Sequence, residues 1–169
     1  GSMKPNLLVG DFLFVSKWDY GYSRYSFPFG LAPISGKIFE KSPKRGDIIV
    51  FKLPCQENIN YVKRILGLPG ETIKVENGLV FIKPKNADTF QQINQIDDGI
   101  FIDDQHQTQI QQLIENNYKI LNLTNNGPLD YTPEYLIPMD KYFFMGDNRD
   151  NSSDSRVMSG VGFVPKVNI

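Results

Sequence analysis

The pair Asn77-Gly78 constrains the fold of this 169-residue chain more than any other feature of its sequence. Two short stretches rich in strand-forming residues, 71–75 and 79–82, flank it. Asn-Gly is a preferred two-residue turn between antiparallel strands, because both residues tolerate the positive φ angles of a type I′ turn. The sequence therefore predicts a β-hairpin here.

Other short apolar runs predict further strands, at 12–15, 48–51, 61–66, 141–145 and 161–165. The run 12–15 suits a buried strand, because all four residues are apolar. Pro69-Gly70 suits the central positions of a type II turn after the 61–66 strand. The connections in the first half are short and no long helix separates the strands, which favours an antiparallel β architecture.

The 61–66 strand contains a lysine between apolar neighbours. Side chains alternate along a strand, so Tyr61, Lys63 and Ile65 share one face. Two hypotheses follow. Lys63 is a solvated strand lysine, or it is walled in and desolvation lowers its pKa, which would let the neutral amine act as a general base.

Residues 146–156 form a run of small polar and charged residues that cannot build a core. Three aspartates and two arginines are interleaved in it. The run predicts a loop whose backbone and side chains are fixed by local charge-assisted hydrogen bonds.

Between residues 83 and 135, Gln, Asn and Asp dominate and apolar residues are sparse. This segment is interpreted as an inserted lobe or as long surface excursions. Ile110, Leu113 and Ile114 fit helical spacing, whereas Asn116-Asn117 followed by the run 118–121 fits a hairpin. We favour the hairpin.

Aromatic side chains crowd into residues 18–29 without a helical or strand period. They are Trp18, Tyr20, Tyr22, Tyr25, Phe27 and Phe29. They line a core-edge loop or form an exposed apolar surface, and Trp and Tyr favour membrane–water interfaces.

Composition excludes several classes of function. Eighteen basic and 19 acidic residues give a net charge of −1, which provides no electrostatic case for nucleic-acid binding. Cys55 is the only cysteine, so no internal disulfide can form, and His106, the only histidine, makes a zinc site poorly supported. No apolar run approaches the roughly 18 residues of a transmembrane helix. Gly1-Ser2-Met3 is typical of an expression scar, so we expect upstream sequence to have been removed.

Three motifs together resemble the type I signal peptidases of bacteria, which are membrane-anchored endopeptidases that remove signal peptides from exported proteins. They are Ser2-Met3-Lys4-Pro5, Tyr61-Val62-Lys63-Arg64 with Gly67-Leu68-Pro69-Gly70, and the run 146–156. The resemblance implies a mainly β fold of antiparallel coiled sheets in a partly open barrel. Residues 1–82 and 136–169 would form the catalytic core, and 83–135 an inserted smaller lobe.

The resemblance also implies site residues. Ser2 resembles the nucleophile and Lys63 the general base, a serine–lysine dyad being one recurring way to activate a hydroxyl. Ser152 resembles the serine that hydrogen-bonds and orients this lysine, while Asp154 and Arg156 match a supporting pair. No cofactor and no metal are implied.

The implied partners are preprotein signal peptides, cut at an Ala-x-Ala-like site, and the membrane lipid surface. A strand at 11–15 would form one wall of the substrate site. The expected substrate-binding residues are Met3, Asp11, Phe12, Leu13 and Phe14, and the expected membrane-facing ones are Trp18, Tyr20, Tyr22, Phe27 and Phe29. The implied location is the bacterial cytoplasmic (inner) membrane, with the catalytic domain on its extracytoplasmic side and this chain a soluble piece without its anchor.

The sequence departs from the family pattern at three places. The small hydroxyl residue expected two places before the nucleophile would precede Gly1, Asn6 replaces the usual threonine, and the chain ends at Ile169, short of the usual last strand. We therefore expect incomplete activity. The alternatives are a self-cleaving repressor-type serine–lysine protease and a non-enzymatic β-rich module that binds a membrane surface.

Overall fold

The computed structural model describes residues 1–16, 42–53, 56–103 and 108–169. Strands dominate it, and the named strands all pair antiparallel. Their bounds are β1 Ile48–Leu53, β2 Gln56–Gly67, β3 Thr72–Glu76, β4 Leu79–Lys83, β5 Gln91–Gln92, β6 Gln95–Asp103, β7 Thr108–Glu115, β8 Tyr118–Asn122, β9 Tyr135–Leu136, β10 Lys141–Met145 and β11 Val164–Pro165. Two 3-10 turns, η3 Arg149–Asn151 and η4 Lys166–Asn168, complete the described elements. The mainly β, antiparallel fold class is confirmed.

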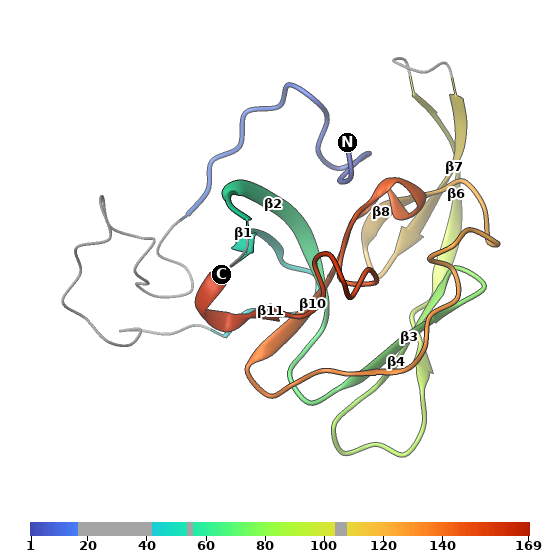
Figure 1. The fold of residues 1–169 in the computed structure, drawn as a ribbon. Helices are drawn as coiled ribbons and strands as arrows, with labels where there is room; N and C mark the ends of the chain where they lie inside the picture. The colour runs from blue at the N-terminus through green and yellow to red at the C-terminus, as the bar shows by residue number, and fades with distance from the viewer. Residues whose placement is uncertain (17–41, 54–55, 104–107) are drawn as a thin grey trace.

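The strands form three sheets, none of them closed (Figure 1). The first has the order β1-β2-β10-β11, the second β5-β4-β3-β9, and the third β6-β7-β8. The third sheet lies within the polar segment 83–135, while β5 and β9, near the two ends of that segment, pair with β4 and β3. The division of the chain into a core and an inserted lobe stays a prediction.

Both predicted hairpins are confirmed, and their turn residues explain their register. Asn77 and Gly78 have φ angles of 53° and 74°, and Glu76 pairs with Leu79 across the turn. Asn116 and Asn117 have φ angles of 46° and 74° between β7 and β8. Positive φ at both central positions is the type I′ geometry, whose twist matches that of paired strands. The helical alternative for 110–114 is therefore wrong.

The turn after β2 also follows the sequence. Gly70 has a φ angle of 82°, and the Glu71 N–H donates to the Leu68 carbonyl at 3.2 Å, as a type II turn requires. The Glu71 carboxylate closes the turn by accepting from the Leu68 N–H at 2.8 Å and from Arg45 at 2.6 Å. This turn sends the chain from the first sheet into the second.

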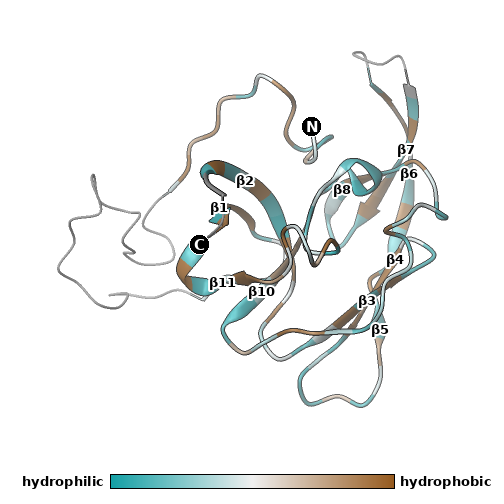
Figure 2. Ribbon diagram, viewed as in Figure 1, coloured by the Kyte–Doolittle hydropathy of each residue, from teal (hydrophilic) through white to brown (hydrophobic). Residues whose placement is uncertain are grey.

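The first sheet is buried on both faces, because alternate residues of β2 and β10 enter two different apolar clusters. Ile65 and Phe144 belong to one cluster, with Ile49, Phe51 and Val164 among its other members. Their neighbours Leu66, Phe143 and Met145 belong to a second cluster with β3 and β4. Figure 2 shows the corresponding hydrophobic stretches on β2 and β10.

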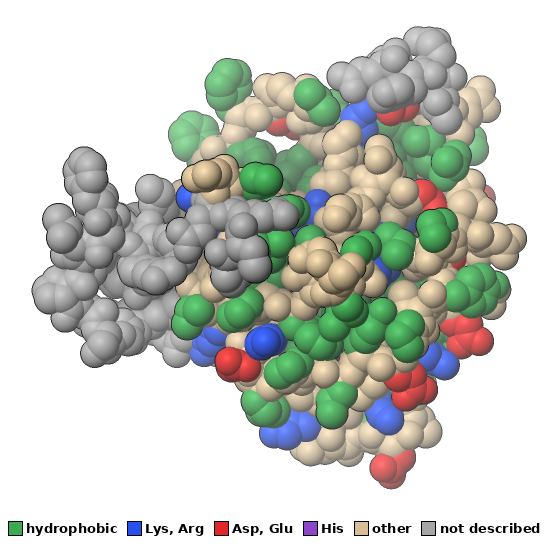
Figure 3. Space-filling view, in the orientation of Figure 1, with side chains coloured by type: hydrophobic (Ala, Val, Ile, Leu, Met, Phe, Trp, Pro, Cys, Tyr) green, Lys and Arg blue, Asp and Glu red, His purple; other side chains and the backbone are tan. Residues whose placement is uncertain are grey.

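The predicted buried strand at 12–15 is wrong. Residues 11–16 have no regular secondary structure, and Phe12 and Phe14 are 98% and 105% exposed. Hydrophobic side chains stand out from the surface along this segment in Figure 3. The segment has no strand partner among the described residues and lies outside both clusters, so its apolar composition reflects something other than core packing. The predicted tail strand 161–165 is also shorter than expected, with β11 limited to two residues.

We predict that Phe144→Ala destabilises the protein by about 3–5 kcal/mol, because it leaves a cavity in a packed core. The Phe144 ring is fully buried, and its centroid lies 4.6 Å from that of Phe51. Urea unfolding measures the effect. The matched control is Phe14→Ala, which should change stability by no more than about 0.5 kcal/mol because this ring is fully exposed. Equal losses in the two variants would contradict the assigned core.

Candidate active site

Lys63 lies in the middle of β2, with its side chain against the first apolar cluster. Tyr61 and Ile65 flank it on the same face, and Ile49 of β1 is directly opposite in the strand register. Only 5% of Lys63 is exposed. Burial lowers the pKa of this lysine, and the nearby carboxylates of Asp154 and Asp147 only partly offset that effect. The hypothesis of a walled-in lysine is confirmed, and the solvated alternative is wrong.

The Lys63 ammonium group meets a hydroxyl that is 61 residues away in sequence. Lys63 Nζ and Ser2 Oγ share a hydrogen bond, and Ser2 is half-buried. In its charged form Nζ donates this bond, and in its neutral form it can accept the Ser2 proton. The structure thus brings together the two residues that the sequence motifs single out.

The Ser2 backbone is held by the loop that begins at Gly146. The Asn148 N–H donates to the Ser2 carbonyl at 3.0 Å, and the Asn148 side-chain amide donates to the Gly1 carbonyl at 3.3 Å. Asn6 donates to the Asp147 carboxylate at 2.7 Å and to the Lys119 carbonyl at 2.6 Å. These bonds position the Ser2 segment beside Lys63.

The loop itself is buried and is fixed by charge-assisted hydrogen bonds, as the sequence predicted. Asp154 is fully buried and accepts Arg156 Nε and Nη2, both at 2.9 Å, and the Gly146 N–H at 3.0 Å. Burial alone would raise the pKa of Asp154, but the charge and hydrogen bonds of Arg156 and the Gly146 N–H lower it. Asp154 therefore stays ionised and joins the two ends of the loop.

Two other ion pairs connect this loop to distant strands, and sequence reasoning missed both. Arg64 donates Nε and Nη2 to the Asp147 carboxylate at 2.8 and 2.7 Å. Arg149 donates Nη1 and Nη2 to Glu115 of β7 at 2.8 and 2.5 Å. Arg64 belongs to the motif Tyr61-Val62-Lys63-Arg64. Glu115 is a lone carboxylate in a Gln-rich stretch, and the sequence around it does not indicate its partner.

The Ser152 Oγ is buried and forms no hydrogen bond to Lys63 in this structure. It lies close enough to Asp154 to help lower the pKa of that carboxyl. Its role in orienting the lysine stays a prediction. A Cβ added at Gly146 would collide with the Ser152 side chain and would lie 2.6 Å from the Ser2 carbonyl oxygen. Ser152 and Ser2 therefore both pack against a position that only glycine fits.

The other expected site residues are distributed less compactly. Met3 is buried, whereas Phe12, Leu13 and Phe14 are exposed, and the Asp11 carboxylate accepts the Leu8 N–H at 2.7 Å. Outside the described residues lie Trp18, Tyr20, Tyr22, Tyr25, Phe27, Phe29, Cys55 and His106. Across the described ranges, no three His, Cys, Asp or Glu side chains gather as metal ligands.

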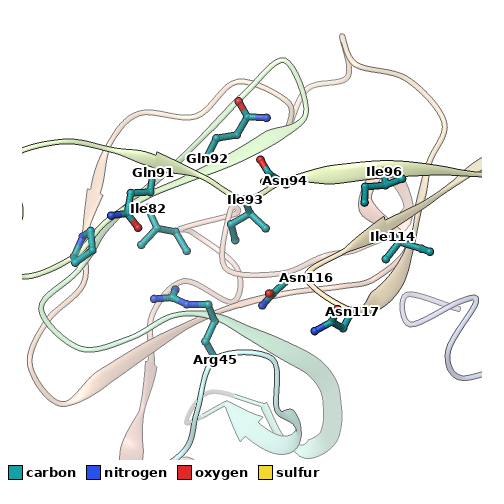
Figure 4. Close-up of a pocket in the computed structure, with 11 residues that line it drawn as sticks. Arg45, Ile82, Gln91, Gln92, Ile93, Asn94, Ile96, Ile114, Asn116 and Asn117 are labelled. Carbon is teal, nitrogen blue, oxygen red and sulfur yellow. The ribbon is translucent and has the colours of Figure 1, made fainter.

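A cavity of about 450 Å³ lies apart from Ser2 and Lys63, between β4 and β5 on one side and the β6–β7 pair on the other (Figure 4). Arg45 and the amides of Gln91, Gln92, Asn94 and Asn116 contribute to its lining. None of the expected site residues lines it, and the Arg45 guanidinium is already bound to Glu71.

Comparisons with known proteins identify the family of this chain. The whole chain, residues 1–169, matches the family model described as signal peptidase, peptidase S26. The signal peptidase I of Rickettsia felis is 37% identical over 177 residues, and that of Rickettsia akari is 39% identical over 171 residues. Each alignment covers 98% of this chain and 64% of the relative, so the chain spans less than two thirds of their length.

A solved structure of a signal peptidase I from Enterococcus faecalis V583 is 25% identical, with a TM-score of 0.43 and coverage of 76% of this chain and 93% of that one. The chain belongs to the signal peptidase family, peptidase S26. Within the described ranges, no helix is long and apolar enough to cross a membrane.

We predict that the Lys63 amine titrates below its ordinary pKa of 10.5, since burial disfavours its charged form. Ile49→Ser should raise this pKa, because opening the wall opposite Lys63 lets water reach the ammonium group. NMR titration of the lysine side-chain resonances measures both values, with the half-buried strand residue Lys52 as the internal reference. An unshifted Lys63 pKa in the folded protein would refute the desolvated environment.

Proposed function

We propose that this chain carries the catalytic centre of a signal peptidase I, with Ser2 as nucleophile and Lys63 as general base. The observation that carries the proposal is the hydrogen bond between Lys63 Nζ and Ser2 Oγ, at a lysine whose pKa burial lowers. Membership of the family supports the same reaction, the removal of amino-terminal signal peptides.

The geometry suits acyl transfer in two steps. Neutral Lys63 takes the proton of Ser2 Oγ as that oxygen attacks the scissile carbonyl carbon, which gives a tetrahedral oxyanion. Collapse breaks the C–N bond, and the Lys63 ammonium group returns its proton to the leaving amine. Lys63 then takes a proton from a water molecule as its oxygen attacks the ester carbonyl carbon. When the C–O bond to Ser2 breaks, Lys63 returns that proton to Ser2 Oγ, and the signal peptide leaves as an acid.

Asp154, Arg156 and Ser152 are proposed as supporting residues. Asp154 and Arg156 pair inside the loop that bonds to the Ser2 backbone, so their contribution would be to keep this loop rigid. Ser152 has a buried hydroxyl that packs against Gly146, as the Ser2 carbonyl does. From this place a rotation of the Ser152 side chain would let its hydroxyl orient Lys63.

The proposed substrate is an extended preprotein segment with small residues at an Ala-x-Ala-like site. The 11–15 segment is exposed and lacks a strand partner among the described residues, so its backbone can pair with a substrate strand. Met3, Asp11 and the side chains 12–14 are the proposed contacts. We place the enzyme at the bacterial cytoplasmic membrane, facing outward, where exposed apolar side chains at 8–15 would lie near lipid.

We predict that Ser2→Ala and Lys63→Met each abolish cleavage of a peptide bearing an Ala-x-Ala site while the fold persists. Because the two residues act as one unit, the double variant should be scarcely slower than either single one. In the unchanged protein, activity should rise with pH through the lowered Lys63 pKa, since the neutral amine exists above it.

Lys52→Met is the matched control for this experiment, because Lys52 also lies on a strand of the first sheet but is half-buried and outside the site. It should keep its activity. Mass spectrometry of the peptide products reads out the four variants and the unchanged protein. Substantial cleavage by Lys63→Met, or a flat rate between pH 5 and 9, would contradict the proposed base.

Substrate recognition has its own test. Replacing the small residue just before the scissile bond by Phe should block cleavage, because an aromatic ring exceeds a shallow pocket fitted to a methyl group. An Ala-to-Ser change at the same position is the control and should be tolerated. Competition between the peptides for one enzyme sample measures the ratio of kcat/KM directly. Indifference to the Phe change would refute the small pocket.

A further inference from the structure

The third sheet contacts the N-terminal segment that carries Ser2 and the 146–156 loop that holds this segment. Lys4, two residues after Ser2, donates to Asp103 at the end of β6 at 2.9 Å, with both side chains largely buried. Asn6 donates to the β8 carbonyl of Lys119 at 2.6 Å. Glu115 at the end of β7 binds Arg149 of the loop. In Figure 1 the chain accordingly begins close to β8.

Glu115 is held more completely than any surface carboxylate would be. It is 0% exposed, and each oxygen accepts two hydrogen bonds. Oε1 accepts Arg149 Nη2 at 2.5 Å and the Tyr118 hydroxyl at 2.7 Å, while Oε2 accepts Arg149 Nη1 at 2.8 Å and the Gln95 amide at 2.9 Å. Burial acts to raise the pKa of Glu115, but the Arg149 charge and these bonds lower it, so both partners are ionised. The direction of the Arg149 side chain is thereby fixed.

Arg149 passes this constraint to the backbone that holds Ser2. Its Nε donates to the Gly146 carbonyl at 3.2 Å, and its own carbonyl accepts Arg156 Nη2 at 2.6 Å. Between those two points lies Asn148, whose N–H donates to the Ser2 carbonyl. The route from Glu115 therefore runs through buried, hydrogen-bonded groups, Arg149 and Asn148, and ends at the half-buried Ser2.

We propose that Glu115 is a positioning residue which, through Arg149, sets Ser2 Oγ against Lys63 Nζ. Lys63 belongs to the first sheet, whereas the Ser2 backbone is bound to the 146–149 loop, so their separation depends on how this loop is anchored. A buried ion pair is weak support for stability, because desolvation offsets much of its attraction. Its orienting effect on the loop is the contribution that the geometry singles out. The inference rests on the proposed function.

The test compares kcat, KM and folded fraction for two variants, E115Q and R149K, acting on the same Ala-x-Ala peptide. E115Q removes the counter-charge, and R149K keeps both charges but loses the planar fork that binds a carboxylate at two points. We expect kcat per folded molecule to fall roughly tenfold or more, since small displacements of reacting groups can cost about 10²-fold. KM and the midpoint of the pH profile should stay unchanged, because the Lys63 wall is intact.

D98N is the matched control. Asp98 belongs to the same sheet and pairs with Lys119, but Asp98 is only half-buried, Lys119 is half-exposed, and neither side chain bonds to the loop. It should behave like the unchanged protein. Circular dichroism gives the folded fraction, so that a simple loss of stability is separated from a loss of rate.

The outcomes are decisive in each case. A kcat per folded molecule equal to that of the unchanged protein in either variant overturns the positioning role, and so does a rise in KM without a fall in kcat. If E115Q does not fold, R149K decides alone. The same assay includes Ser2→Ala. An active Ser2→Ala variant refutes the proposed function itself, whereas an inactive one with fully active E115Q and R149K refutes only the inference about Glu115.

Discussion

An ammonium group enclosed by aliphatic side chains loses the water that stabilises its charge, and the other features of this site depend on that loss. Lys63 projects from a central strand onto a face that also carries Ile65 and faces Ile49 across the sheet. The apolar cluster on this face encloses the amine. The resulting desolvation lowers the pKa of Lys63, so the neutral amine forms at a lower pH than in water.

The charged residues of the 146–156 loop compensate for water that its buried backbone groups lose. A loop that must approach the lysine closely would carry unsatisfied backbone groups into a dry region. Here the Asp154 carboxylate accepts the Gly146 N–H, and Arg156 donates to the Arg149 carbonyl, so the backbone is satisfied by the loop's own side chains. Buried carboxylates and guanidinium groups thus take over the part that water plays on an ordinary surface loop.

The sequence predicted those parts of the fold and site that local chemistry determines. The turns at Asn77-Gly78 and Asn116-Asn117 fixed two hairpins because positive φ angles are a property of the turn residues themselves. Strand alternation placed Lys63 between Tyr61 and Ile65 on one face but left its burial open, because that depends on what packs over the face. The partner of Arg149 could not be predicted, because Glu115 is 34 residues away and nothing in its local sequence indicates a buried cation beside it. The prediction of a buried strand at 12–15 was wrong, because a run of four apolar residues does not show whether other parts of the chain pack over it.

The alternation of β2 has a consequence for the way this protein can fail. Lys63 and Arg64 are adjacent cations on opposite faces, one against an apolar cluster and one paired with Asp147. A slip of one residue between β1 and β2 would exchange them. It would place a guanidinium that cannot lose its proton against the apolar cluster and leave the aspartate beside a lysine. Such a misregistered sheet could retain much of its apolar burial and its strand pairing and still have no titratable base. The bulge near the start of β2 and the type II turn at its end fix the register of this strand. They therefore determine that Lys63, and not Arg64, faces the apolar cluster.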